Sequence, residues 1–329
     1  MISKSEAYRV RRYSNEDFDA WNAFVEKSKN GTFLFDRHYM DYHSDRFEDC
    51  SLMVFKKDKL LAVFPANKLG EALYSHQGLT YGGLILSDTI KFEAVTAIVI
   101  SLLQYLMGQQ FKTLYIKQIP SIYSKVFTEE LNYLFFILKA ELVIKDILSV
   151  INLKADFIVS KDRLDGYKRA LKHHLVVKEV DEMESFWNQI LIKNLRNKHK
   201  TKPVHSLEEI TLLKSRFPKH IRQFNVYDKD KIVAGTTIFE THLVAHSQYI
   251  SGNQDKNLLG SLDFLHFHLI KNVFQEKTYF DFGCSNENNG LHVNKGLLYW
   301  KEGFGAKTVT QEFYKVDVGN WELLKTVFI

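Results

Sequence analysis

Residues 278–306 constrain the fold of this chain more than any other stretch, because their pattern changes twice over a short distance. They begin with an apolar run at 279–282 (YFDF) and break at Gly283 into polar turn residues. From Leu291, apolar residues recur at helical spacing until Gly303 and Gly305. This pattern predicts a buried strand, a polar turn and a short helix that begins near Leu291, followed by a strand over 309–318.

The polar turn is expected to form part of a binding site. Asp281 precedes it, and Ser285, Asn286 and Glu287 lie within it, so these side chains follow the C-terminal end of a predicted central strand. Open α/β sheets bind their ligands at this end of the strands. The sequence therefore predicts that this turn forms the floor of an active site.

The order of predicted elements repeats along the chain. KLLA at 59–62 matches KIVA at 231–234, and Tyr74-Ser75 matches His246-Ser247 at the same offset of 172 residues. The repeated order, in which a hairpin interrupts the alternation of strands and helices, differs from that of a doubly wound fold. We therefore predict an α/β chain of two tandem units, 1–155 and 156–329, each a mixed, mostly antiparallel sheet flanked by helices.

The length of 329 residues also favours two domains. Cys50 and Cys284 provide neither a disulfide framework nor a zinc motif, and the histidines lack metal spacing, so no metal site is expected. The N-terminal residues lack the apolar core of a secretion signal, and the most apolar helix candidate, 92–107, is too short to span a bilayer. We therefore expect a cytoplasmic protein without a membrane span.

The charge distribution favours anionic ligands. The net charge is +5, too small for a dedicated DNA-binding protein. Between the two halves lie two predicted helical stretches, 160–180 and 186–206, with basic faces that include Lys168, Arg169, Lys172, Lys193 and Arg196. These faces are either ordinary solvated surfaces or an electropositive wall for phosphate-bearing ligands.

The segment 299–304 (YWKEGF) resembles the Tyr-Glu-Lys-x-Gly-Phe signature on the last helix of GNAT-type N-acyltransferases. Two such units in tandem, with a basic helix before the second, resemble the Fem family (FemA, FemB, FemX) of double-GNAT transferases. The resemblance rests on 232–253 and 281–306 in the second half, and on element order alone in the first. It implies transfer of an acyl or aminoacyl group to a primary amine, of an amino sugar or a nucleotide-linked cell-envelope precursor.

The donor stays open between acyl-CoA and aminoacyl-tRNA. GNAT enzymes that use acyl-CoA, as a co-substrate rather than a tightly bound cofactor, carry a Gln/Arg-x-x-Gly-x-Gly/Ala loop for the pyrophosphate. The matching stretch, 257–262 (NLLGSL), keeps only one of the two small residues, and Fem-type enzymes also lack the full loop because their donor is aminoacyl-tRNA. If acyl-CoA is the donor, the resemblance implies binding by Tyr249, Ile250, Ser251, Lys256, Gly260 and Ser261.

Aminolysis requires a neutral amine, a stabilised oxyanion and a protonated leaving group. The strand 243–251 is expected to splay from its neighbour, as in the GNAT resemblance, and so to free backbone N–H groups for the carbonyl oxygen. Strand alternation places His246, Gln248 and Ile250 on one face and Ser247, Tyr249 and Ser251 on the other. One of these faces is expected to line a cleft.

Three residues are predicted to be catalytic. Tyr299 corresponds to the GNAT tyrosine that protonates a departing thiolate, and Lys301 after Trp300 matches a Fem-type Phe-Lys pair that offsets charge at the carbonyl. Residues two apart on a helix do not share a face, so Tyr299 suits acyl-CoA and Lys301 suits tRNA. Asp281 is a candidate general base, because loss of water disfavours the charged form of a buried carboxylate; it could equally cap the turn.

The first unit is expected to bind the acceptor and the second to bind the donor, with the acceptor in the groove between them. The residues predicted to bind the acceptor are Arg37 and His38 in the first half and His199, His246, Gln248, Ser285 and Glu287 in the second. The alternative function is a catalytically degenerate double-GNAT scaffold that binds an anionic ligand or partner.

Overall fold

The computed structural model describes residues 8–329 except for the side chains of residues 198 and 199, and it divides into two compact units. Unit 1 comprises the described residues up to Lys145 together with 311–329, and unit 2 comprises 146–310. The boundary near residue 155 that the sequence predicted therefore differs from the structure. The C-terminal segment belongs to unit 1 because Val316, Val318 and Leu324 are part of its hydrophobic core.

Unit 1 has two groups of hydrogen-bonded strands. The first has the order β1-β3-β4-β7 and is antiparallel throughout, with β1 (Tyr8–Arg12), β3 (Leu52–Lys56), β4 (Lys59–Phe64) and β7 (Ile85–Leu86). The second has the order β17-β8-β6-β5-β2, with β17 (Lys307–Asp317), β8 (Thr113–Lys117), β6 (Ala72–Tyr74), β5 (Asn67–Leu69) and β2 (Glu48–Asp49). Among the strands described in this unit, β6 and β8 form the parallel pair.

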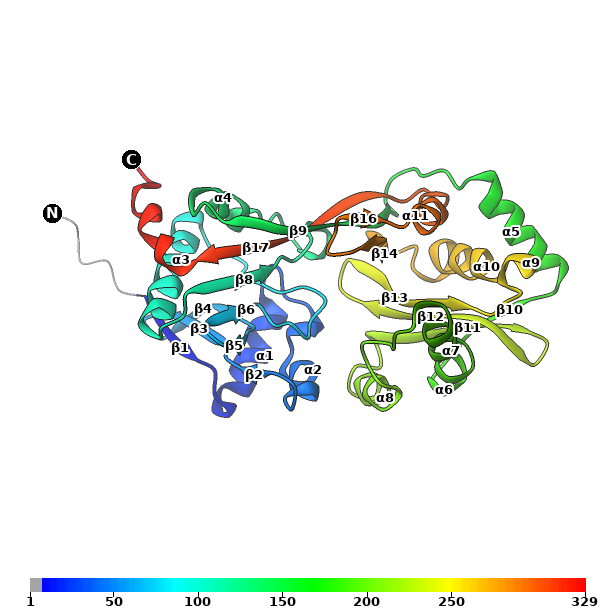
Figure 1. Cartoon of the computed structure of the whole chain (residues 1–329), viewed down its shortest axis with the longest axis horizontal. Helices are drawn as coiled ribbons and strands as arrows, with labels where there is room; N and C mark the ends of the chain where they lie inside the picture. Colours follow the sequence, from blue (N-terminus) through cyan, green and yellow to red (C-terminus); the bar gives the residue numbers. More distant parts are fainter. Residues whose placement is uncertain (1–7) are drawn as a thin grey trace. The chain divides into compact units, whose positions relative to one another are not determined.

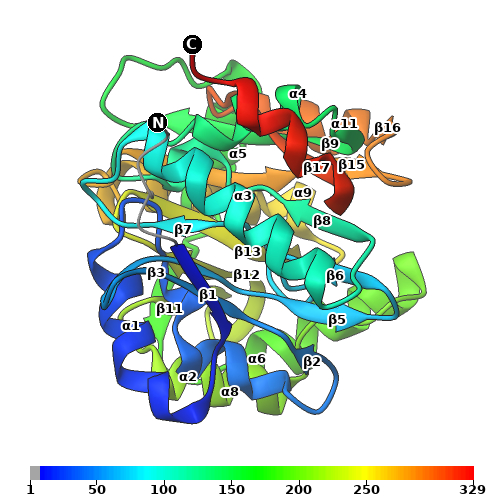
Figure 2. The same cartoon turned by 90° about the vertical axis from the view of Figure 1, so that its left-hand side faces the viewer.

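Helices cover both faces of the unit 1 strands (Figure 2). The helix α3 (Phe92–Gly108) buries a stripe of apolar residues, which includes Val95, Ile98, Leu102 and Leu106 at helical spacing. The other helices are α1 (Phe18–Lys27), α2 (Arg37–Met40), α4 (Glu130–Ile137) and the short 3-10 helices η1 (Asn15–Asp17), η2 (Phe33–Phe35), η3 (Asp41–His43), η4 (Ser121–Tyr123) and η8 (Val318–Thr326).

Unit 2 has a sheet of order β10-β11-β12-β13-β14-β9. Its strands are β10 (Val176–Val180), β11 (Ile221–Asp228), β12 (Lys231–Glu240), β13 (Val244–Gly252), β14 (Tyr279–Cys284) and β9 (Glu141–Asn152), and a small hairpin of β15 (Asn286–Glu287) and β16 (His292–Val293) follows β14. Only β13 and β14 run parallel in this sheet. The parallel pair, joined through a helix as in unit 1, confirms the predicted tandem repeat.

Helices form a layer on each face of the unit 2 sheet (Figure 1). One layer contains α5 (Lys161–Lys172), α9 (Lys256–Leu259), α10 (Ser261–His268), the π-helix η7 (Leu269–Val273) and α11 (Lys295–Glu302). The other contains α6 (Glu184–Phe186), η5 (Trp187–Leu191), α7 (Ile192–Asn194), η6 (Leu195–His199) and α8 (Leu207–Arg216). Phe224, Phe274, Phe280, Phe282 and Phe304 supply much of the core of this unit.

Two predicted helices are shorter than the sequence suggested. The helix α11 begins at Lys295 rather than near Leu291, because Asn294 caps it and the residues before form the β15–β16 hairpin. The helix α5 ends early because His174 takes a left-handed conformation. The residues from Val176 then form the strand β10, which pairs with β11. Among residues 8–329, no helix combines the length and the hydropathy needed to cross a membrane.

Candidate active site

The candidate site lies where the parallel strands β13 and β14 diverge. They pair over only three residues of each strand, and the last pair joins His246 to Asp281. Each strand then becomes irregular against its antiparallel neighbour: β13 has an extra residue at Gln248 opposite β12, and β14 has one between Asp281 and Cys284 opposite β9. Bulges of this kind end regular pairing and redirect side chains. Divergence of the 243–251 strand from its neighbour, as the sequence predicted, is therefore confirmed.

His246 and Asp281 form a hydrogen-bonded pair at this point. Nδ1 of His246 lies 2.9 Å from Oδ2 of Asp281, and the second carboxylate oxygen accepts the backbone N–H of Gly283 at 2.7 Å. The Asp281 side chain is 1% exposed and that of His246 is 12% exposed. Because a carboxylate accepts hydrogen bonds, Nδ1 carries the hydrogen of this contact, and in the neutral form of the ring the lone pair is on Nε2. His246 is therefore the member of the pair that can accept a proton from a ligand.

Gly283 allows the imidazole to lie close to the backbone. Its φ of +70° falls in the left-handed region, and an added Cβ would lie 3.1 Å from Cε1 of His246. A side chain at this position would be strained and would crowd the imidazole. The glycine that the sequence marked as a simple break in the strand thus shapes the surroundings of His246.

Lys301 stabilises the backbone turn at Gly283 and Cys284. Its side chain is buried at 2% exposure, and Nζ donates to the carbonyl oxygens of Gly283 at 2.9 Å and Cys284 at 2.6 Å. Burial lowers the pKa of Lys301 to about 8, while the nearby Cys284 and Asp281 act in the opposite direction. The ammonium group thus places positive charge next to the turn where β13 and β14 diverge.

Two polar atoms in these segments lack a hydrogen-bond partner. They are Oε1 of Gln248, at the bulge of β13, and Oγ of Ser285, which is 3% exposed and directly follows β14. Buried polar atoms normally have partners, so unsatisfied ones beside a candidate site are suited to contact a ligand. Glu287 differs from these two residues. It is exposed and accepts a hydrogen bond from Nδ2 of Asn294 at 3.1 Å.

Tyr299 points away from Lys301, as the predicted helix spacing requires. Its side chain is 59% exposed, and its hydroxyl donates to Oδ2 of Asp162 at 2.8 Å. This hydrogen bond raises the pKa of Tyr299. The structure thus joins Tyr299 to α5, and it brings Lys301 and Asp281 together with His246.

The residues predicted to bind acyl-CoA through β13 have protein partners. The hydroxyl of Tyr249 lies 2.6 Å from Nδ1 of His205, and its ring meets the edge of Trp187 on the other face of the sheet from α10. Ser251 accepts a hydrogen bond from Nδ2 of Asn194 at 2.7 Å. Ile250 packs against the hydrophobic core of unit 2.

The segment that matches the pyrophosphate loop is covered by α5. A Cβ at Gly260 (φ +68°) would overlap the carbonyl oxygen of Gly166, so α5 and the start of α10 touch through their backbones. In the first turn of α10, buried Asp263 accepts hydrogen bonds from Arg163 at 2.7 Å and Trp300 at 2.8 Å. Ser261 is fully buried, and Lys256 is the first residue of α9. A buried carboxylate and a backbone carbonyl thus lie at the segment that matches that loop.

Arg37 is one of the residues predicted to bind the acceptor. It lies outside this region and has a structural role. It is 3% exposed, and its guanidinium pairs with Asp41 and Asp49 and lies 3.9 Å from the ring centre of Tyr13. His38 is exposed and meets the edge of Phe18. His199 ends η6, and its side chain lies outside the described residues.

The sequence analysis named His246 and Asp281 separately and missed that they are partners. The sequence analysis placed both residues on strands of the second unit, and the parallel pairing of these strands brings residues far apart in the chain to one level of the sheet. The register of that pairing was not readable from the sequence. Within residues 8–329, no three His, Cys, Asp or Glu side chains are grouped so that they could hold a metal ion.

Comparisons with known proteins bear on the fold. No family model and no curated protein matches the sequence. Solved structures do match: a structure of FemX has a TM-score of 0.68 at 11% identity and covers 97% of this chain and 99% of that chain. L-PGS from Bacillus licheniformis has a TM-score of 0.60 at 15% identity, covering 95% of this chain and 96% of the other.

A tandem GNAT protein from the clavulanic acid biosynthesis pathway has a TM-score of 0.51 at 11% identity and covers 95% of this chain and 99% of that chain. At such identities the likeness concerns the fold. It extends over both units and agrees with the parallel strand pair and covering helix found in each of them. The chain therefore has the tandem GNAT fold of the Fem-like proteins.

Proposed function

We propose that this protein is an N-acyltransferase that moves an aminoacyl group from an ester donor to a primary amine at the His246–Asp281 pair. The observation that carries the proposal is the geometry of this pair at the point where β13 and β14 diverge. In the GNAT resemblance, the same divergence receives the acyl carbonyl. The similarity in fold to FemX and to L-PGS supports aminoacyl transfer as the class of reaction.

His246 would act as the general base. An acceptor amine is protonated at neutral pH and must lose a proton before its nitrogen attacks the carbonyl carbon. Nε2 of His246 takes this proton, and Asp281 holds the imidazole and stabilises its charged form through Nδ1. This assignment moves the role of base from Asp281, whose two oxygens already accept hydrogen bonds from His246 and Gly283.

The remaining steps require stabilisation of negative charge and departure of the donor oxygen. The pairing of β13 with β14 ends at His246, so backbone N–H groups just beyond it are suited to hold the oxyanion. Lys301 adds positive charge beneath the turn. When the C–O bond of the ester breaks, the proton on Nε2 passes to the leaving oxygen and the attacking nitrogen releases its second proton to solvent, so an amide and a free alcohol result.

Aminoacyl-tRNA is the donor that the local structure favours. The contact between Gly166 and Gly260, together with buried Asp263, opposes binding of a CoA pyrophosphate in the position that the GNAT resemblance implies. The exposed face of α5 carries Lys168, Arg169 and Lys172, which suit a phosphate backbone. The acceptor would be an amino sugar or a nucleotide-linked envelope precursor, met in the cytoplasm.

The donor assignment can be tested with the full chain. The protein is incubated with a radiolabelled pool of aminoacyl-tRNA and a panel of amine acceptors, and with acetyl-CoA and the same acceptors. We expect label to move to an amine from tRNA only, and calorimetric titration with CoA at millimolar concentration to produce no binding heat. Transfer from acetyl-CoA would contradict the proposed donor.

A second set of outcomes separates the enzyme from a binding scaffold. If nucleotide sugars stabilise the protein to heat but no donor supports transfer, the catalytic proposal fails and the degenerate scaffold is favoured. If transfer occurs and the His246→Ala variant retains it fully, the reaction stands and the site assignment fails.

A further inference from the structure

Unit 1 has a groove of about 1340 Å³ along one side of α3. Its walls come from β1, from the hairpin of β3 and β4, and from the loop that leads from β7 into α3. Nothing in the candidate active site uses it, because that site lies entirely within unit 2. We define this groove by Tyr8, Lys56, Lys59, Lys91 and Tyr105 and call it the α3 groove.

Three lysines gather along the α3 groove without acidic partners. The β3–β4 pairing places Lys56 directly opposite Lys59, an arrangement of like charges that destabilises a hairpin unless an anion compensates it. Lys91 immediately precedes α3 and also lines the groove. Within residues 8–329, no carboxylate forms an ion pair with any of the three, and Glu93 is the one acidic residue in the lining.

The lysines mark one end of the groove. Tyr8 pairs with Lys56 across β1 and β3, so Tyr8, Lys56 and Lys59 form one row. Tyr105 lies near the other end, since it interacts electrostatically with Arg12, the last residue of β1. From Lys91 to Tyr105, α3 rises by about 21 Å at 1.5 Å per residue. The groove is thus elongated, with its positive charge concentrated at the start of α3.

The lining between the two ends is mostly small or apolar. Val10 and Leu61 face it from the strands, and Ala94, Ala97 and Ile100 face it from α3. Val10 and Leu61 are only partly buried, although they pack against the unit 1 core. Ser101 and Gln104 add polar groups to the α3 side of the groove. A groove with an apolar stretch that ends in lysines without acidic partners is complementary to a molecule with an apolar chain and a negative head.

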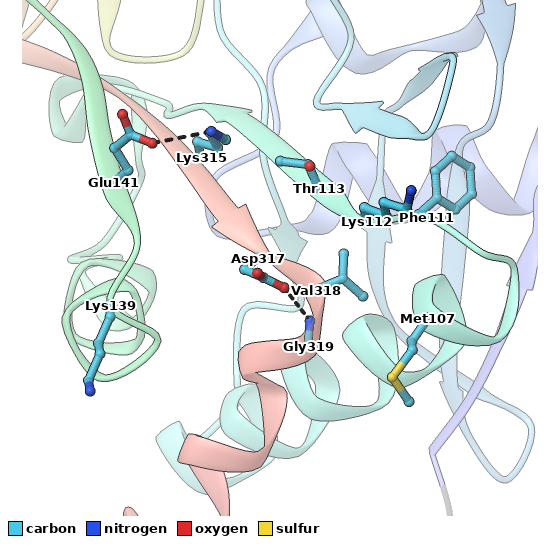
Figure 3. A pocket seen from close by; sticks show the side chains of 10 residues that line it. All are labelled: Met107, Phe111, Lys112, Thr113, Lys139, Glu141, Lys315, Asp317, Val318 and Gly319. Carbon is cyan, nitrogen blue, oxygen red and sulfur yellow. Dashed lines mark hydrogen bonds and ion pairs between the residues drawn. The ribbon is translucent and has the colours of Figure 1, made fainter.

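A second hollow in unit 1 has a different character (Figure 3). It measures about 610 Å³ and also contains lysines, but Lys315 pairs with Glu141 at 3.4 Å, and Asp317 accepts the backbone N–H of Gly319 at 2.8 Å. Lys112 also has an acidic partner, Glu71 at 2.6 Å. Two of the three lysines of this hollow are therefore ion-paired, whereas the three lysines of the α3 groove have no acidic partner among residues 8–329.

We propose that the α3 groove binds a long-chain carboxylate, with the carboxylate at Lys56, Lys59 and Lys91 and the chain along α3 toward Tyr105. The charge complementarity supplies the attraction for the head, and removal of the chain from water supplies the rest. This site is separate from the proposed transferase site and does not depend on that function.

The experiment titrates dodecanoate into the full chain by calorimetry, below the concentration at which dodecanoate forms micelles. Two probes separate the features of the ligand: acetate has the head without the chain, and dodecyltrimethylammonium has the chain with the opposite charge. We expect saturable binding of one dodecanoate per chain, and neither probe should reproduce it.

Three variants locate the site. Replacing both strand lysines (Lys56→Ala with Lys59→Ala) should weaken binding by about tenfold or more, since charge-assisted contacts are lost. Ala97→Trp should block binding by filling the channel, from a helix position that is not fully buried. Lys139→Ala removes a lysine of the other hollow (Figure 3) and should leave dodecanoate affinity unchanged.

Several results would overturn the proposal. Absence of dodecanoate binding to the wild-type chain would do so, and so would equal binding of dodecyltrimethylammonium, which would indicate association through the chain alone. Unchanged affinity in both the double lysine variant and Ala97→Trp would place the ligand elsewhere. Circular dichroism of each variant distinguishes loss of binding from loss of folding.

Discussion

His246 and Asp281 occupy the last paired level between two parallel strands, with Nδ1 of the imidazole 2.9 Å from Oδ2 of the carboxylate. Past this level the strands separate. The pair therefore lies at the last paired level of the two strands, with a carboxylate that is 1% exposed and an imidazole that is 12% exposed. This position makes the pair the centre of the proposed reaction.

Loss of either member should lower transfer activity by a similar factor. We expect His246→Ala to reduce kcat/KM by about 10²–10⁴-fold, because the base is removed. Asp281→Asn should have a comparable effect, since an amide does not hold the imidazole in the same tautomer. The double variant should lose little more than either single variant. Additive losses, measured on folded proteins, would show that the residues do not act together.

Replacing Gly283 should harm both folding and catalysis. Gly283→Ala forces an L side chain into the left-handed region and toward Cε1 of His246, and we expect a cost of about 1–2 kcal/mol in unfolding free energy. Gly296→Ala is the matched control: it lies inside α11 with open space around it and should stabilise by roughly 0.5–1 kcal/mol. Urea denaturation measures both. Equal effects of the two changes would contradict the role of Gly283.

Lys301 should make stability depend on pH in the alkaline range. Its pKa is lowered from 10.5 to about 8 in the folded chain. Between these values the unfolded chain holds a proton that the folded chain has lost, so the unfolding free energy rises with pH, by up to roughly 3 kcal/mol. Below pH 8 both states are protonated, and the full cost of the buried charge is present.

The measurement compares urea denaturation of the wild type and of Lys301→Met at pH 8 and at pH 10.5. Other groups titrate in both proteins, and their contributions cancel in the difference. We expect the wild type to gain stability relative to the variant over this interval. Parallel pH dependence in the two proteins would show that Lys301 is not the group responsible.

Arg37 should contribute to stability rather than to acceptor binding. Its buried guanidinium pairs with Asp41 and Asp49, which are themselves about one third exposed, so Arg37→Met should cost about 1–3 kcal/mol. The exposed neighbour provides the control, since His38→Ala should change stability by less than about 0.5 kcal/mol. An unchanged melting temperature for Arg37→Met, with a raised KM for the acceptor, would restore the binding role.

The basic face of α5 should matter for a polynucleotide donor. Lys168→Glu with Lys172→Glu should weaken tRNA binding and reduce the slope of log Kd against log salt by about one for each lysine that contacts a phosphate. Lys139→Glu is the control. It makes the same change of charge at one residue of unit 1 and should leave this slope unaffected. Filter binding at several salt concentrations tests the difference.

Much of the fold was predictable because its signals are local. The apolar run before Gly283, the stop signals at Gly303 and Gly305 and the long apolar helix α3 all reflect periodicity that the chain carries by itself. The repeat was readable for the same reason. The unit boundary was not, because the last strand returns to unit 1 through pairing with β8, a contact between residues distant in the sequence.

The sequence by itself determined which chemical groups are present near the turn after residue 281 and that a strand leads into it. Only the tertiary structure decided their roles. It paired Asp281 with His246, and it buried Lys301 while leaving Tyr299 exposed. It also buried the Arg37 side chain, which pairs with Asp41 and Asp49. The physical reason is that strand register and helix rotation depend on packing between segments far apart in the chain, and short-range residue patterns do not encode that packing.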